Sequence, residues 1–122
     1  MTTTVRLADI AHARSGDKAD RADIGLFAWN AAGYALLERA VTAERVAEHF
    51  AHLASGGVAV TAQRYELPNL LALKFVLDHA LAGGAARSLR SDNLGKTIAA
   101  QLLRMTIEAD AAAADAAHRR PR

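Results

Sequence analysis

The chain of 122 residues contains no cysteine. Without thiols it has no disulfide framework, no thiol nucleophile and no site in which cysteine holds zinc or an iron–sulfur cluster. Aromatic residues make up only 5%, and the formal charge is +2, from 15 Lys and Arg against 13 Asp and Glu. A protein that binds nucleic acid normally carries a concentrated basic face or stacking aromatic side chains. We therefore expect no nucleic-acid partner.

Long apolar runs are missing as well. No run approaches the roughly 20 residues that a membrane-spanning helix needs. The first residues, Met-Thr-Thr-Thr-Val-Arg, lack the apolar stretch of a signal peptide. The expected protein is cytoplasmic and has no membrane partner. Its 52% hydrophobic and 23% charged residues are typical of a globular domain large enough to bury one core.

The spacing of apolar residues predicts strands over residues 5–11, 24–29, 58–65 and 85–89. Helices are predicted over residues 34–50, 68–81 and 92–107. Thr42 is the expected N-cap that divides the first of these segments into two helices, and Asp92 is the expected N-cap of the last. This order predicts an α+β fold, a two-layer sandwich with helices packed on one face of a mainly antiparallel sheet. Residues 1–110 are expected to form a single domain, followed by a frayed alanine-rich and basic tail over residues 111–122.

The densest polar segment is Arg14-Ser15-Gly16-Asp17-Lys18, which lies in a predicted loop over residues 12–21. The Arg14 guanidinium can hold a carboxylate or phosphate through two hydrogen bonds. Gly16 lets backbone N–H groups approach a ligand, and Asp17 can orient Lys18 or act as a base. Ser15 adds a hydroxyl. The alternative is a solvated turn with weak surface ion pairs.

A second candidate segment, Arg64-Tyr65-Glu66-Leu67-Pro68-Asn69, joins a predicted strand to a predicted helix. Polar groups at such a junction can line a cleft, with Glu66 as a general base, Arg64 as an anion clamp and Asn69 as a further ligand contact. The alternative is that Tyr65 packs in the core and its charged neighbours lie on the surface.

The remaining candidates are single side chains. Lys96 follows Gly95, but Arg90 stands where a phosphate-binding loop requires glycine; a lysine in a first helical turn still favours a bound anion. His12 precedes the Arg14 segment and can relay protons near pH 7. A pair of histidines three residues apart, His49 and His52, could suit a metal but has no evident third ligand, so no metal site is predicted there.

Several segments occur together in the same order as in one family: residues 11–18, 64–70, 75–77, 80–84, 88–90 and 95–96. From about Leu7 to Ile107 the chain resembles the AtuA-like ferredoxin-fold proteins, a small domain fused to the acyclic terpene utilization protein AtuA or encoded beside an AtuA-like large protein. The resemblance implies a ferredoxin-like fold, a setting in catabolism of branched acyl-CoA compounds, an AtuA-like large partner and no metal or redox cofactor.

Three positions depart from the pattern of that family. Ala19 stands where glycine is usual, Asp23 where asparagine precedes Ile-Gly, and Lys74 where asparagine precedes Phe-Val-Leu. If the asparagines contact a ligand or partner, specificity in this chain differs. The Arg14–Lys18 core of the motif is intact.

Three functions follow, in order of preference. The first is an accessory subunit that binds an AtuA-like large protein and contacts an acyl-CoA or related acid through Arg14, Lys18 and Arg64. The second is a stand-alone hydratase or isomerase in which His12, Asp17 and Glu66 converge around a carboxylate base. The third is a structural homo-oligomer without chemistry, which an uncovered sheet face or helix stripe would support.

Overall fold

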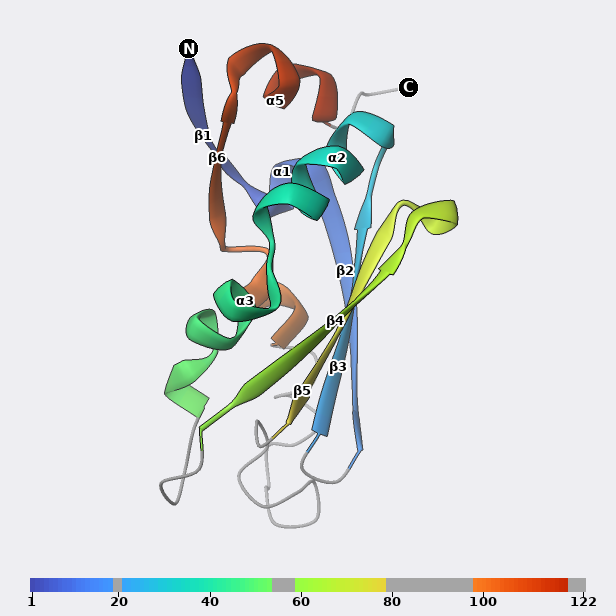
Figure 1. Ribbon diagram of the computed structural model, residues 1–122, viewed down its shortest axis with the longest axis vertical. Coiled ribbons are helices and arrows are strands. Elements are labelled where there is room, and N and C mark those ends of the chain that lie inside the picture. The colour runs from blue at the N-terminus through green and yellow to red at the C-terminus, as the bar shows by residue number, and fades with distance from the viewer. Residues whose placement is uncertain (19–20, 54–58, 79–97, 119–122) are drawn as a thin grey trace.

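A computed structural model describes residues 1–18, 21–53, 59–78 and 98–118 (Figure 1). The strands are β1 (Thr2–Arg6), β2 (Ala11–Lys18), β3 (Arg21–Ala28), β4 (Thr61–Leu67), β5 (Ala72–Asp78) and β6 (Thr106–Asp110). The α-helices are α1 (Leu7–Ile10), α2 (Ala31–Ala40), α3 (Ala43–His49) and α5 (Ala111–Ala117). Short 3-10 helices are η1 (Ala51–Leu53) and η2 (Pro68–Leu70), and residues 98–102 are helical.

The strands form two antiparallel sheets. The larger has the order β2-β3-β5-β4, and the smaller pairs β1 with β6. Side chains alternate between the faces of a strand, so each central strand of the larger sheet contributes one buried row. These rows are Ala22, Ile24, Leu26 and Ala28 from β3, and Leu73, Phe75 and Leu77 from β5.

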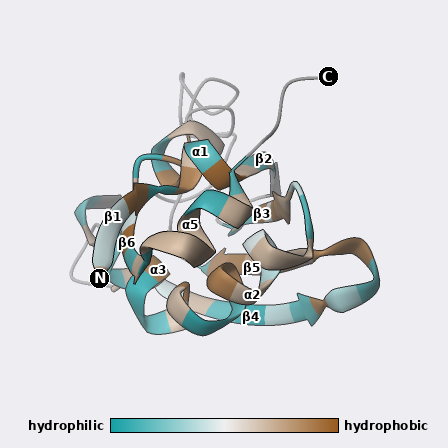
Figure 2. Ribbon diagram, turned by 90° about the horizontal axis from the view of Figure 1, so that it is seen from above, coloured by the Kyte–Doolittle hydropathy of each residue, from teal (hydrophilic) through white to brown (hydrophobic). Residues whose placement is uncertain are grey.

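The helices cover this buried face of the four-stranded sheet (Figures 1 and 2). Helix α2 contributes Leu36 and Leu37 to the core, and α3 contributes Val46. Both α2 and α3 begin with a side-chain cap. The Asn30 Oδ1 atom accepts a hydrogen bond from the Gly33 amide at 2.8 Å, and the Thr42 hydroxyl accepts one from the Arg45 amide at 3.1 Å. The predicted Thr42 cap and the predicted α+β sandwich are therefore confirmed.

The predicted helix over residues 68–81 is wrong through residue 78, the last described residue there. Pro68–Leu70 forms only the 3-10 helix η2, and β5 follows. The leucines have helical spacing, but Leu73, Phe75 and Leu77 also fit strand alternation, and pairing with a strand on each side decides between the two. The turn is made at Leu71, whose φ is 54° and whose amide donates to the Pro68 carbonyl at 3.1 Å.

The loop predicted over residues 12–21 is wrong at residues 12–18 and at residue 21, because β2 pairs with β3 from Ala11 opposite Ala28 to Lys18 opposite Arg21. Residues 19–20 lie outside the described residues. The strand expected over residues 5–11 is divided between β1 and α1. Strand β2 lies at an edge of its sheet. An edge strand with one solvated face can carry charge and glycine, which made it resemble a loop.

Near the C-terminus, the helix predicted as far as Ile107 gives way to β6, whose Ile107 and Ala109 alternate into the core. The fraying expected from residue 111 is not observed over Ala111–Ala117. Those residues form α5, capped by the Asp110 carboxylate, and bury Ala114 and Ala117. The predicted strand over residues 85–89 and the Asp92 cap lie outside the described residues. The strand predicted over residues 58–65 corresponds to β4, which begins at Thr61.

None of the helices in the described ranges combines the length and apolar character needed to cross a bilayer.

Candidate functional site

The face of the four-stranded sheet turned away from the helices, called the open face here, carries rows of aligned side chains. Residues directly opposite each other in antiparallel strands share a face, so the register defines each row across the sheet. The Phe27 row consists of His12, Phe27, Ala72 and Leu67. The Gly25 row consists of Arg14, Gly25, Lys74 and Tyr65. The next row contains Gly16, Asp23, Val76 and Gln63.

A hollow of about 370 Å³ lies over these rows. Its lining is Arg14, Ser15, Gly16, Asp23, Gly25, Phe27, Leu67, Ala72, Leu73 and Lys74. The floor depends on Gly25, since a Cβ atom at that position would lie 2.8 Å from the Cε2 atom of Phe27. The absence of a side chain at Gly25 therefore lets the Phe27 ring lie against the backbone.

Among the described residues that line the hollow, the charged side chains are two cations and one carboxylate. The Lys74 Nζ atom lies 4.0 Å from the Asp23 Oδ2 atom, and both side chains are about half exposed. The Asp23 Oδ1 atom accepts a hydrogen bond from the Gly16 amide at 3.0 Å. Arg14 is exposed and has no hydrogen bond or ion pair with another residue of the described ranges. An exposed pair such as Lys74–Asp23 contributes about 0.2–1 kcal/mol, so a ligand can compete for it.

One end of the open face is aromatic and apolar. The His12 ring stacks on Phe27, with centroids 5.1 Å apart, and lies 4.6 Å from the Trp29 ring. A hydrogen bond of 2.9 Å from the Ala28 amide to the Leu71 carbonyl places the end of β3 beside the η2 turn. Trp29, Leu67 and Leu70 are 39%, 37% and 61% exposed. We call these three residues the apolar rim; Figure 2 shows the hydrophobic turn between β4 and β5 projecting beyond the helices.

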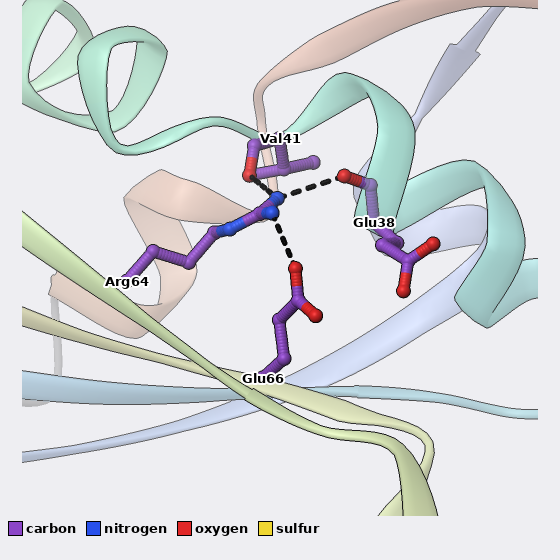
Figure 3. Close-up of polar contacts among 4 residues, drawn as sticks. All are labelled: Glu38, Val41, Arg64 and Glu66. Atoms are coloured by element: carbon purple, nitrogen blue, oxygen red, sulfur yellow. Dashed lines mark hydrogen bonds and ion pairs between the residues drawn. The ribbon is translucent and has the colours of Figure 1, made fainter.

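The Arg64–Glu66 pair lies on the other, helix-covered face (Figure 3). The Arg64 Nη1 atom donates to the Glu38 carbonyl at 2.8 Å and to the Val41 carbonyl at 3.1 Å. The Arg64 Nη2 atom donates to the Glu66 Oε2 atom at 2.7 Å. Cationic side chains stabilise the carbonyls at a helix C-terminus. These contacts join β4 to the end of α2 and occupy the guanidinium that was predicted to hold an anion.

The Tyr34 hydroxyl is buried on the same helix-covered side and has no hydrogen-bond partner within the described ranges. Burial raises the pKa of this hydroxyl above its ordinary value of 10.0, and the Glu38 and Glu66 carboxylates raise it further. The Arg64 guanidinium opposes them. Tyr34 is therefore held in its neutral form and is a poor base near neutral pH.

The structure brings some of the predicted residues together and separates others. Arg14, Ser15 and Gly16 line the hollow, and His12 lies in the neighbouring row. Arg64 and Glu66 lie across the sheet from them, so the convergence of His12 with Glu66 that a stand-alone carboxylate-base enzyme requires is absent. Asn69 is exposed in η2. In the pairing of β2 with β3, Asp17 lies opposite Ala22 and Lys18 lies opposite Arg21. Lys96 lies outside the described residues.

Sequence reasoning missed seven of the residues that line the hollow: Asp23, Gly25, Phe27, Leu67, Ala72, Leu73 and Lys74. Asp23 and Lys74 had been noted only as departures from a family pattern. The available signal was the alternation of β3, in which Arg21, Asp23, Gly25 and Phe27 share one face. That signal locates a site only after β5 is recognised as a strand.

His49 and His52 border a separate hollow of about 360 Å³, together with Gln101 and Arg104. A ring nitrogen of His49 lies 2.7 Å from the Gln101 carbonyl oxygen. Within the described ranges, no three His, Cys, Asp or Glu residues are grouped so that they could hold a metal ion. His49 therefore contacts the segment 98–104, and the described residues around the two histidines offer no metal-ligand set.

Comparison with protein families finds a match over residues 5–108 to the AtuA ferredoxin-like domain. The match covers the whole four-stranded sheet, parts of β1 and β6, and all the described α-helices except α5. It confirms the expected ferredoxin-like class for this antiparallel α+β sandwich. Comparisons with curated proteins and with solved structures give no match for this chain.

Proposed function

The chain belongs to the AtuA ferredoxin-like domain family, and from this premise we propose that it is an accessory binding subunit. It works with an AtuA-like large partner in the catabolism of acyclic terpenes or other branched acyl-CoA compounds. Strand β2 supplies the anion contact through Arg14, with Lys18 on the same strand. The observation that carries the proposal is the exposed Arg14 guanidinium, which has no hydrogen bond or ion pair among the described side chains, beside a hollow on an open sheet face.

The chemistry of the hollow favours binding over catalysis by this chain alone. A general acid or base must reach the proton that it transfers. Glu66 is engaged by Arg64 on the helix-covered face, and Tyr34 is buried there in its neutral form. An accessory subunit needs only a ligand contact and a surface for its partner, and the open face offers both.

The apolar rim is the proposed surface for the large partner. Exposed aromatic and aliphatic side chains gathered at one place are typical of protein interfaces, and the rim lies next to the hollow through the shared residue Leu67. A partner seated on Trp29 and Leu70 would thus border the ligand site and could complete its wall.

The test is affinity purification of the tagged full chain from its native host, followed by mass spectrometry. We expect a stoichiometric AtuA-like large protein to co-purify. Arg14→Ala should reduce ligand binding or activity of the complex, whereas Arg39→Ala, which removes an exposed arginine of α2, should leave both unchanged. Recovery of the chain without any large protein would contradict the accessory role.

A structural homo-oligomer is the second candidate, and the uncovered open face is the observation that favours it. An exposed sheet face with half-exposed Tyr65 and Leu67 can pack against a second copy. Light scattering after size-exclusion chromatography distinguishes the candidates. A stable oligomer that binds neither ligand nor large protein would favour the structural role.

A further inference from the structure

We infer that the hollow on the open face binds a free aliphatic carboxylate. The carboxylate lies on Arg14, and the hydrocarbon chain runs over Gly25 onto Phe27, Leu67 and Ala72. This inference rests on the proposed function in using the same anion contact. It goes further in naming the ligand class and in choosing the free acid over its coenzyme A thioester.

The balance of charge favours a single negative charge. Arg14 is unengaged in the described chain, whereas Lys74 lies beside Asp23. A dianion such as a phosphate monoester would be repelled by Asp23, whose carboxylate also borders the hollow. A carboxylate needs only one cation, and the planar guanidinium matches it through two parallel hydrogen bonds.

The placement of apolar residues favours an amphiphile over a small acid. The Phe27 row is adjacent to the Gly25 row, two residues along each strand and therefore about 7 Å away. A ligand whose head is on Arg14 reaches Phe27, Ala72 and Leu67 with a short hydrocarbon chain. Removing that chain from water against these side chains supplies most of the affinity.

The size of the hollow favours the free acid over the thioester. Its volume of about 370 Å³ is near the lower end of the range of about 300–1,000 Å³ for small-molecule sites. A coenzyme A group would lie largely outside it. The thioester carbonyl is also uncharged, so it cannot form the charge-assisted pair with Arg14 that a carboxylate forms.

Gly25 determines which ligands fit, because it lies between the cation and the apolar row. A Cβ atom there would meet the Phe27 ring at 2.8 Å, so that the ring, which also lines the hollow, would have to move. The Gly25→Ala variant should therefore lose binding of the ligand's hydrocarbon chain even though Arg14 remains. The thermal unfolding transition of this variant shows whether it still folds. A second, less strained variant combines Gly25→Ala with Phe27→Leu, because leucine removes the ring that a Cβ atom at position 25 would meet.

The experiment is a titration of the full chain with octanoate, in which binding is measured by changes in amide chemical shifts and by calorimetry. Octanol has the same chain without charge, acetate has the charge without the chain, and inorganic phosphate and octanoyl-CoA are the competing ligand classes. Octanoate should bind best. Arg14→Ala should weaken octanoate binding by roughly tenfold or more, Arg39→Ala should not change it, and Lys74→Ala should have the smaller effect.

Preference for phosphate, with equal losses in Arg14→Ala and Lys74→Ala, would overturn the inference in favour of a dianion. Tighter binding of octanoyl-CoA through Arg14 would overturn the choice of free acid and leave the proposed function standing. A chain that co-purifies with a large partner but binds none of the probes would overturn the inference alone. Failure of both the co-purification and the octanoate titration would remove the proposed function as well.

Discussion

At the scale of single residues, two arginines of identical chemistry have opposite environments. Arg64 is largely buried and donates to the Glu38 and Val41 carbonyls and to Glu66. Arg14 is exposed on the open face and unengaged within the described ranges. A guanidinium whose donors already have partners stabilises the fold, whereas one without partners is available to a ligand. Local sequence suggested the same anion-binding role for both.

Tyr34 gives a prediction of pH dependence at this scale. The pKa of the Tyr34 hydroxyl is raised above 10.0 in the folded state, so the unfolded chain ionises at a lower pH than the folded chain. The stability that depends on the neutral hydroxyl is therefore complete below pH 10 and is lost as the pH rises through the folded-state pKa. Tyr34→Phe should therefore unfold less readily than the wild type above about pH 10. Near pH 7 its free energy of unfolding should be equal or higher by about 1 kcal/mol, since a buried hydroxyl without a partner is removed.

Urea unfolding at both pH values measures this difference. Tyr65→Phe is the matched control, because the Tyr65 hydroxyl is at an exposed side chain and donates to Gln63 at 2.8 Å. If Tyr34→Phe lost stability in parallel with the wild type as the pH rose, the hydroxyl would not be the group that titrates.

At the scale of secondary-structure elements, α5 is the part whose role differs most from expectation. Its seven residues are mainly alanine, which has high helix propensity but little apolar surface. A helix this short is marginal by itself, so its stability comes from the Asp110 cap and from packing against α2 and β1. The Asn30 side chain also donates to the Ala116 carbonyl at 3.0 Å. The segment thus belongs to the core and not to a tail.

Charge placed on the buried side of α5 tests this role. Ala114→Glu puts an unpaired carboxylate at a position that is 2% exposed and should lower the free energy of unfolding by about 2–4 kcal/mol. Ala112→Glu adds the same group on the exposed side of the first turn, where the helix dipole favours it. Thermal or urea unfolding of the two variants should separate them clearly; equal, small effects would mean that α5 does not pack.

At the scale of the whole molecule, the sandwich has one face covered by helices and one face open. Three of the large hydrophobic side chains exposed in the described ranges, Trp29, Leu67 and Leu70, lie at the same end of the four-stranded sheet. A free monomer gains nothing from exposing them, so the proposed assembly with a large partner would be expected to cover this end.

The chain's one tryptophan reports on that assembly. Trp29 is 39% exposed, so binding of the large partner at the apolar rim should shift its fluorescence emission to shorter wavelength. Leu70→Glu should reduce partner binding by roughly tenfold or more and abolish the shift. Ala35→Glu adds the same charge on the exposed side of α2 and should leave both unchanged. Partner binding that left Trp29 emission unaltered would place the interface elsewhere.

The sequence by itself determined the class of fold, the helices over residues 34–50 with their Thr42 cap, and the family. These features depend on short-range patterns, namely capping and apolar spacing, and on motifs in a fixed order. Local sequence also identified Arg14, Ser15 and Gly16 as candidates, because charge and glycine together are recognisable without a partner strand.

Only the tertiary structure decided which face each residue occupies. Leu73 and Leu77 fit a helix as well as a strand, and it was pairing with β3 and β4 that made this segment β5. The same pairing set Lys74 beside Gly25 and Arg14, and turned Arg64 and Glu66 to the helices. Register is a property of two strands together, so no single segment contains the information that separates the open face from the covered one.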